Sequence, residues 1–276
     1  MDFGDIIGNA FQYTYDGLTG RPATWILLII MSQLYYIPLI GAVIFMIAAG
    51  IRPESLLSQL PLLAAGLAVT FLLILLVTSF YYGFMIPVMY KEAEMPAFPD
   101  PWILFSNGIR YLIIELLYFI IPVILVLVTI VFTLLPVINS PATHMAAPRL
   151  DLVLIMLAGF TLAFLSALVL YLFWVTGIVR FARTGSLPEA FNFTGILGTI
   201  RRIGWGFYCL SLVILAILLF IFGFAMFVIQ TILGIIPVIG FIFMLIVLLV
   251  QIVLGPFITI FMHRYFSLLY DCAEPA

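Results

Sequence analysis

The chain has 276 residues, of which 66% are hydrophobic and only 8% are charged, and its mean hydropathy is +1.35. Soluble domains average about 45–50% apolar and about 25% charged residues, so this composition excludes a soluble protein and predicts one embedded in a lipid bilayer. The net charge of -2 arises from 10 basic and 12 acidic residues spread thinly along the chain, which excludes nucleic acid as a partner.

Six apolar runs are each long enough to cross the roughly 30 Å of bilayer hydrocarbon, which takes about 20 helical residues. They lie at 24–49, 60–88, 111–138, 151–179, 205–233 and 238–262. The leader before the first run carries Asp2, Asp5 and Asp16 instead of positive charge, so we expect this run to be a span and not a cleaved signal peptide. The connection GIIPVIG (234–240) is so short and apolar that the last two spans are expected to form a tight antiparallel hairpin.

The stretch MPAFPDPWILFSNGIR (95–110) precedes the third span and is too polar to cross the membrane. Asp100 followed by proline predicts a helix N-cap, after which Trp102 and Phe105 lie on one face and Arg110 on another. This pattern is typical of a short amphipathic helix that lies in the membrane interface.

A second copy of this pattern, LPEAFNFTGILGTIRR (187–202), precedes the fifth span. Ser186 and Glu189 have the spacing of a capping box, and the apolar residues that follow recur at helical intervals. The candidate interfacial anchors of the two stretches are Trp102, Phe105, Phe193, Arg110, Arg201 and Arg202.

The start of the chain, MDFGDIIGNAFQYTYDG (1–17), provides a third such stretch, with Asp2 as a possible cap before Ile6 and Ala10. Each stretch precedes an odd-numbered span, so the sequence predicts three units, at about 1–91, 92–183 and 184–266, with a cytoplasmic tail at 267–276. The expected fold is a single all-α membrane domain of six transmembrane helices in three hairpins, each preceded by a short interfacial amphipathic helix.

Basic residues predict the orientation of the chain, because Lys and Arg favour the cytoplasmic side of short loops. Eight of the ten fall on one side in this topology, namely Arg21, Lys91, Arg110, Arg180, Arg183, Arg201, Arg202 and Arg264. Only Arg52 and Arg149 fall on the other side. Both termini are therefore expected in the cytoplasm, with the protein in the cell membrane.

Four stretches of the sequence belong together: DFGDIIGNAFQY near the start, RFARTGSLPEAFNFTGILGTIRR at 180–202, and the shorter IPLIG and IPVIG. They resemble the prokaryotic, largely archaeal family of multi-pass membrane proteins called domain of unknown function 4013. The resemblance covers nearly the whole chain and implies a polytopic membrane protein without an assigned activity. It provides no catalytic residues to carry over.

No reactive motif emerges from the sequence. His144 and His263 are isolated, HExxH, G-x-S-x-G and P-loop patterns are absent, and no aspartate lies deep in a predicted span. We therefore expect no metal, no cofactor and no enzymatic activity.

Glu115 is an ionisable residue inside a predicted span, at a shallow depth about one and a half turns from the start of the third span. A charged carboxylate at the centre of a membrane helix costs about 2.5–3.5 kcal/mol on insertion scales, so it needs water or a partner. It is either a proton or cation site, or an ion-pair partner of Arg110, Arg201 or Arg202. Gln33 and Gln251 are the intramembrane amides that we add to the candidate ligand or proton site.

Three classes of function remain open, and the third of them is a membrane enzyme, for which the sequence contains no reactive constellation. The chain is expected to be a non-catalytic scaffold or the partner of another membrane component, with lipid around it. The alternative is a carrier for lipid or another apolar small molecule, a function that is compatible with an apolar helical bundle with few charged residues.

Overall fold

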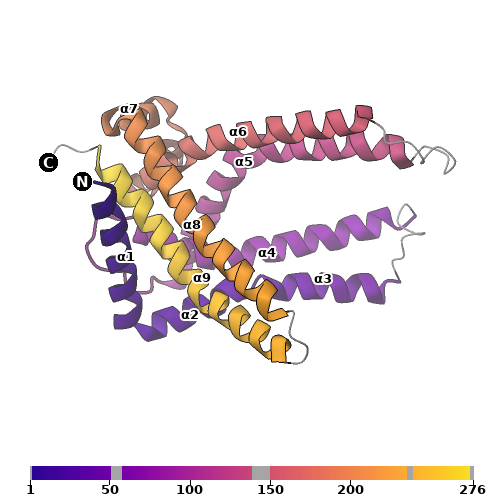
Figure 1. The fold of residues 1–276 in the computed structure, drawn as a ribbon, viewed down its shortest axis with the longest axis horizontal. Helices are drawn as coiled ribbons and strands as arrows, with labels where there is room; N and C mark the ends of the chain where they lie inside the picture. Colours follow the sequence, from indigo (N-terminus) through magenta and orange to yellow (C-terminus); the bar gives the residue numbers. More distant parts are fainter. Residues whose placement is uncertain (1, 51–57, 139–149, 235–238, 274–276) are drawn as a thin grey trace.

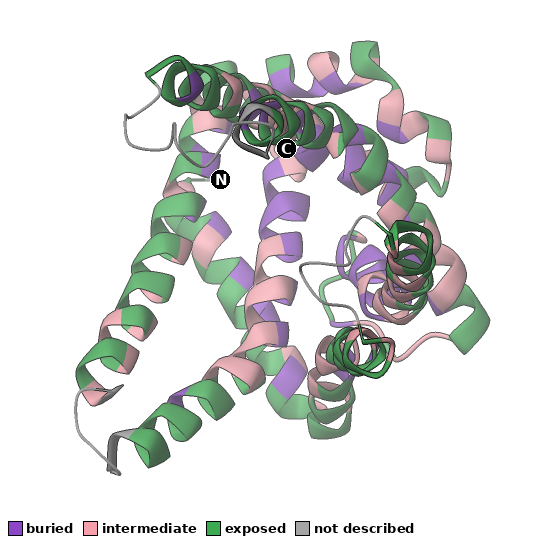
Figure 2. Ribbon diagram, turned by 90° about the vertical axis from the view of Figure 1, so that its right-hand side faces the viewer, coloured by how far each residue is buried: buried purple, intermediate pink, exposed green. Residues whose placement is uncertain are grey.

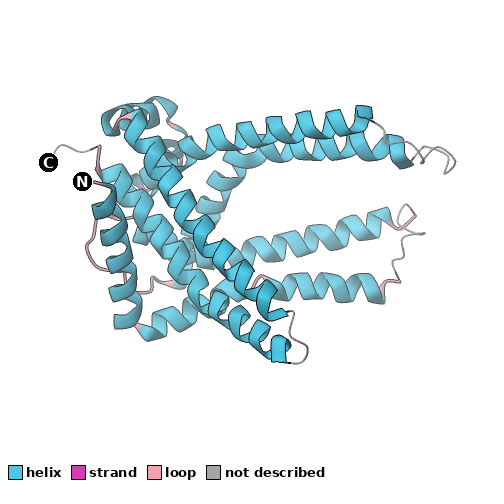
Figure 3. Cartoon of the chain, in the orientation of Figure 1, coloured by secondary structure: helices cyan, strands magenta, loops and turns pink. Residues whose placement is uncertain are grey.

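The computed structural model describes residues 2–50, 58–138, 150–234 and 239–273, which are helical apart from short connections and contain no β-strand (Figure 3). The helices in chain order are α1 (Phe3–Gly20), α2 (Pro22–Gln33), α3 (Tyr36–Ala48), α4 (Leu60–Val88), α5 (Pro101–Ile138), α6 (Leu150–Thr184), the 3₁₀ helix η3 (Leu187–Phe191), α7 (Phe193–Ile203), α8 (Trp205–Gly234) and α9 (Ile239–Asp271). The predicted all-α class is confirmed.

The six predicted spans are also confirmed. The described residues contain six helical segments that are long and apolar enough to cross a membrane. The first consists of α2 and α3 together, and α4, α5, α6, α8 and α9 supply the others.

The first span differs from the prediction because it is interrupted. A turn at Leu34 and Tyr35 separates α2 from α3, and Pro38 is the third residue of α3. The first four N–H groups of a helix have no partner within it, so proline fits there without the loss of a hydrogen bond.

The stretch at 95–110 does not form a helix of its own. Its second half is the beginning of α5, which runs unbroken from Pro101 into the span. Asp100 caps this helix as predicted, with its Oδ1 atom accepting from Trp102 N at 2.8 Å. Leu104 and Gly108 are buried against α4, so packing favours one continuous helix over a turn at the start of the span.

The second copy of this stretch begins differently from the prediction. Ser186 makes no capping hydrogen bond, and residues after it form η3. The cap of α7 is Asn192, whose side-chain oxygen accepts from Gly195 N at 3.0 Å. Glu189 does not close a capping box because its carboxylate is bound to Arg180 instead.

The last span is longer than predicted, and the predicted tail at 267–276 is helical in its first part. Helix α9 continues to Asp271, with Ser267, Leu268 and Leu269 buried against the bundle. These contacts continue the helix by two turns beyond the apolar run that ends at residue 262.

The hairpins α3/α4, α5/α6 and α8/α9 meet at one end of the molecule and spread apart toward the other (Figures 1 and 2). Helix α1 runs transverse to α4, α5 and α6 across the end where the hairpins meet, and it packs against α9 (Figure 1). We call the end that carries α1, η3 and α7 the closed end, and the other the open end.

Close contact between α4 and α5 holds the closed end together. A Cβ atom added to Gly108 would lie 1.6 Å from the carbonyl oxygen of Ser79, and one added to Gly83 would lie 1.9 Å from that of Leu104. Only glycine permits the two backbones to approach this closely. The two helices separate beyond this crossing, which directs α3/α4 and α5/α6 into different arms (Figure 1).

The short helices α1 and α7 at the closed end bury their apolar faces against the rest of the protein. Ile6 and Ala10 of α1 and Ile196 and Ile200 of α7 are fully buried in the same hydrophobic cluster. The polar residue Thr199 is buried as well and donates to the carbonyl of Gly195. These helices therefore complete the core of the closed end.

Candidate functional site

Polar and aromatic side chains gather at the closed end, where they join helices far apart in sequence. His263 of α9 is 3% exposed, and its Nε2 atom lies 2.9 Å from the hydroxyl of Tyr111 on α5. Its Nδ1 atom lies 2.7 Å from the carbonyl oxygen of Thr259, which can only accept. A neutral ring protonated at Nδ1 satisfies both contacts, with Tyr111 donating to Nε2.

Glu115 lies one turn after Tyr111 on α5 and is half-buried. Its carboxylate is close enough to Tyr82 and Tyr111 to interact electrostatically with both, and the rings of these two tyrosines stack with centroids 4.8 Å apart. Glu115, Tyr82, Tyr111 and His263 thus form one polar cluster, which we call the tyrosine–histidine cluster, between α4, α5 and α9.

The tyrosine–histidine cluster makes a direct prediction for stability. Tyr111→Phe keeps the ring but removes the donor to a buried imidazole nitrogen, which should destabilise the protein by about 1–3 kcal/mol. Denaturation in detergent micelles measures this loss, with Tyr15→Phe at an exposed position as the control. Equal stability of Tyr111→Phe and wild type would contradict the assigned hydrogen bond.

Two further contacts tie α9 to the end of α4. Arg264 donates through Nη1 to the carbonyl of Tyr90 at 2.8 Å and lies over the ring of Tyr13 at 4.2 Å from its centroid. Ser267 donates to the carbonyl of Met89 at 3.0 Å. These bonds satisfy carbonyl groups that the end of α4 leaves without intrahelical partners.

Arg183 at the end of α6 binds α9. Its Nη2 atom lies 2.8 Å and 2.9 Å from the two carboxylate oxygens of Asp271 and 2.8 Å from Ser267 Oγ. Hydrogen bonds between charged groups are about twice as strong as neutral ones, so this contact fixes α6 on α9.

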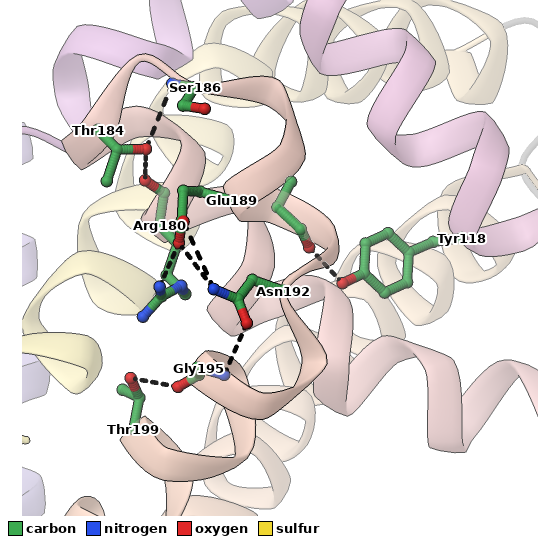
Figure 4. A network of polar contacts seen from close by, with 9 residues as sticks. Tyr118, Arg180, Thr184, Ser186, Glu189, Asn192, Gly195 and Thr199 are labelled. Carbon is green, nitrogen blue, oxygen red and sulfur yellow. Dashed lines mark hydrogen bonds and ion pairs between the residues drawn. The ribbon is translucent and has the colours of Figure 1, made fainter.

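Figure 4 shows the third arginine contact, in which Arg180 of α6 binds the carboxylate of Glu189 in η3. Asn192 also donates to that carboxylate while its own oxygen caps α7. Tyr118 of α5 reaches the same segment, because its hydroxyl donates to the carbonyl of Ala190 at 2.6 Å. Arg180, Asn192 and Tyr118 together hold η3 and α7 against the end of α6 and the middle of α5.

The Arg180 guanidinium, followed by Asn192, lowers the pKa of Glu189 below its ordinary value. A carboxylate whose pKa falls on folding stabilises the fold above its unfolded pKa, and this contribution disappears as the pH falls through the lowered folded pKa. Glu189→Gln should therefore be less stable than wild type near neutral pH, with the difference closing in acid. Thermal unfolding over an acidic pH series measures the difference in stability between the variant and wild type. A difference that does not change with pH would contradict the assigned role of Glu189. The control is Glu92→Gln, which changes an exposed carboxylate.

The residues predicted as a ligand or proton site do not come together. Gln33 donates to its neighbour Ser32 at the end of α2, and Gln251 of α9 accepts from Gln230 of α8 at 3.4 Å. No hydrogen bond within the described ranges joins Glu115, Gln33 and Gln251. The predicted ion pair of Glu115 with a nearby arginine is also not formed among the described residues.

The predicted interfacial anchors lie at the surface of the closed end. Trp102 is 73% exposed, Phe193 is also exposed, and Phe105 is half-buried. The exposed arginines among them are Arg110, Arg201 and Arg202. Arg52 and Arg149, which the sequence assigned to the opposite side, lie outside the described residues.

Sequence reasoning missed His263, Arg264 and Tyr111 as linked residues. In the sequence, His263 is an isolated histidine and Arg264 is one of the basic residues that predict the orientation. Tyr111 and His263 are 152 positions apart, and no local pattern connects them. The one available signal was the unusual presence of a histidine and an arginine side by side at the end of a span.

The geometry defines a polytopic α-helical membrane protein whose polar contacts are concentrated where its hairpins meet. The chain belongs to the family described as protein of unknown function (DUF4013), whose model matches residues 62–231, more than half of the chain. The match runs from α4 into α8, so α1 and α9, with His263 and Arg264, lie outside it. Comparisons with curated proteins and with solved structures found no match.

Proposed function

We propose that the protein is a non-catalytic scaffold of the cell membrane that binds another membrane-embedded chain through the open end of its helical hairpins. In this arrangement the closed end faces the cytoplasm and fixes the hairpins relative to one another. The hairpin arms then present apolar surfaces to a partner within the bilayer.

The observation that supports this proposal most is the unequal distribution of packing. Toward the open end, α3 packs mainly on α4, α6 mainly on α5, and α8 mainly on α9, and long series of large apolar side chains are exposed (Figure 2). Lipid covers such surfaces as well as protein does, but three separated arms on a rigid base present more helix surface than a compact bundle. A second membrane chain can therefore bind between or beside the arms.

The distribution of basic residues supports the proposed orientation. Arg21, Arg180, Arg183 and Arg264 all lie at the closed end, as do the exposed arginines of α5 and α7. Positive residues favour the cytoplasmic side, so both termini are proposed to be cytoplasmic.

Purification from native membranes in a mild detergent tests the scaffold proposal. We expect a companion protein at a fixed ratio to the chain. Gly223→Trp, which adds a large side chain to α8 at a position with open space around it, should reduce that ratio without a clash inside the fold. Gly41→Trp adds the same side chain to α3 and should also reduce the ratio. Gly8→Trp on α1 is the matched control at the closed end and should leave the ratio unchanged. A chain that purifies without a companion, or a ratio that neither arm variant changes, would contradict the proposal.

A second function, transport of a lipid or another apolar molecule, has one specific observation in its favour. A groove of about 640 Å³ lies between α3 and α4 and is lined almost entirely by apolar side chains from Leu34 to Val77. An acyl chain fits such a lining. Transfer of a fluorescent lipid by the protein reconstituted in vesicles tests this function. Ala42→Phe, which would fill the groove, and Glu115→Gln should each stop the transfer. A protein that is only a scaffold would transfer no lipid even as wild type.

A further inference from the structure

A polar cavity of about 580 Å³ lies at the closed end, between α1, the segment that follows α4, and α9. One face of α1 lines it with Asn9, Tyr13 and Asp16, which recur at helical spacing. The opposite wall contains Glu94 and Arg264. Such a concave site with few, convergent polar groups is the usual form of a small-ligand site.

Two guanidinium groups, of Arg264 and Arg21, line this cavity without a carboxylate in ion-pair contact within the described residues. Arg264 is only 7% exposed, and its Nε atom is buried with no hydrogen-bond partner in the described part of the chain. Arg21 is half-buried and uses one of its five donors on the carbonyl of Met95 at 2.7 Å. The carboxylate of Asp271 interacts with Arg264 electrostatically from beyond ion-pair distance, but it is hydrogen-bonded to Arg183. A buried cation without a carboxylate in direct contact is costly, so the site favours a ligand that brings negative charge.

The same cavity also carries two carboxylates, of Asp16 and Glu94, which form no ion pair with its arginines. Both are exposed at its margin, whereas Arg264 is at its base. The two arginines and the two carboxylates have no net charge together, and the carboxylates at the margin would repel a simple anion. A ligand with a negative group for the arginines and a positive group for the carboxylates matches both pairs of side chains.

We propose that this cavity binds a phosphate group joined to an ammonium group by a linker of two carbon atoms, as in a phosphoethanolamine headgroup. The guanidinium groups of Arg21 and Arg264 bind the phosphate oxygens, because the guanidinium fork matches phosphate geometry. Asp16 and Glu94 bind the ammonium group. This site is independent of the scaffold function proposed above, and each can fail without the other.

Tyr13 positions the deep arginine. Its ring lies under the guanidinium of Arg264, and its hydroxyl donates to the carbonyl of Glu94 at 3.4 Å. Burial raises the pKa of Tyr13 to about 12, so the phenol stays neutral and does not neutralise Arg264 at physiological pH. Arg264 therefore keeps its charge available for the ligand.

The position of the cavity suits a lipid headgroup. One of its walls is a face of α1, which crosses the end where the hairpins meet (Figure 1). The neighbouring basic and aromatic residues are those expected at the level of the headgroups. A soluble phosphoethanolamine compound has the same chemistry, and the experiment separates the two sources.

The test measures thermal stabilisation of the purified full chain in detergent by four probes. They are short-chain phosphatidylethanolamine, short-chain phosphatidylglycerol, soluble O-phosphoethanolamine and inorganic phosphate. We expect the ethanolamine lipid to bind about threefold more tightly than the glycerol lipid, since Asp16 and Glu94 are exposed and exposed ion pairs contribute little. Binding of O-phosphoethanolamine as tight as that of the lipid also supports the site and assigns it to a soluble ligand.

Variants separate the two halves of the site. Arg21→Gln should weaken both lipids about tenfold, whereas Asp16→Asn, at an exposed position, should remove only the preference for ethanolamine over glycerol. Arg201→Gln, an exposed arginine outside the cavity, is the matched control and should bind as wild type. Equal binding of the two lipids by wild type, or wild-type binding by Arg21→Gln, would overturn the proposal.

Discussion

Gly108→Ala should destabilise the protein by about 3 kcal/mol or more, because its new Cβ atom would meet backbone and not a flexible side chain. The nearest atoms are the carbonyl oxygen, carbonyl carbon and Cα of Ser79, at 1.6, 2.4 and 2.7 Å. Backbone of α4 cannot turn aside as a side chain can, so α4 and α5 must separate. Unfolding of the purified protein by increasing denaturing detergent in mixed micelles measures the loss.

The matched control for Gly108→Ala is Gly223→Ala in α8, another membrane helix. No atom lies within 4 Å of the position of its added Cβ. Alanine is the better helix former by about 1 kcal/mol, so this variant should be as stable as wild type or slightly more stable. Similar losses for the two variants would show that the α4–α5 crossing is not the cause.

Arg183→Met should have the second-largest effect, a loss of about 2–3 kcal/mol. The substitution keeps most of the apolar stem but leaves Asp271 and Ser267 without the guanidinium that binds both. Arg183 and Asp271 are 16% and 19% exposed, so solvent compensates part of the cost of a fully buried charge. The same unfolding measurement in mixed micelles detects the loss.

Two further variants show whether the ion pair is responsible. The double variant Arg183→Met with Asp271→Asn removes both charges and should recover part of the stability lost in the single variant. Arg201→Met, at an exposed position of α7, should stay within about 0.5 kcal/mol of wild type. An additive double variant would mean that the two residues do not interact across α6 and α9.

The membrane spans could be predicted from sequence because hydrocarbon selects for long apolar runs, and this signal is local. The ends of the spans could not be predicted in this way. The amphipathic pattern at 95–110 fits an interfacial helix, but it fits equally well the start of a long helix with one face packed on a neighbour. Because Leu104 and Gly108 pack on α4, the segment forms the start of the long helix α5.

The glycines illustrate the same limit. Close packing is found at Gly83 and Gly177, where an added Cβ atom would meet backbone of a neighbouring segment within 2.6 Å, and at Gly159, where it would meet Thr129. Gly41 and Gly223 are also glycines within apolar sequence, but an added Cβ atom at either position would meet no atom within 4 Å. Sequence shows where a helix allows close approach, but only the fold shows whether another helix is there.

The arginines were predicted to mark the cytoplasmic boundary, and their partners could not be predicted. Arg180 contacts Glu189 nine positions later, a distance that a sequence pattern can suggest. Arg183 and Asp271 are 88 positions apart and meet only because α6 and α9 pack side by side. Tertiary contacts of this range depend on the arrangement of the helices and not on local spacing.

The central claim is that the closed end, with its arginine contacts and both termini, faces the cytoplasm. In a variant without Cys209 and Cys272, single cysteines are introduced by Thr194→Cys in α7 and by His144→Cys in the connection between α5 and α6, which lies outside the described residues. A membrane-impermeant maleimide added to intact cells should label position 144 and should reach position 194 only after the membrane is permeabilised. Labelling of position 194 in intact cells, with none at position 144, would contradict the orientation on which the proposed scaffold and the proposed headgroup site both depend.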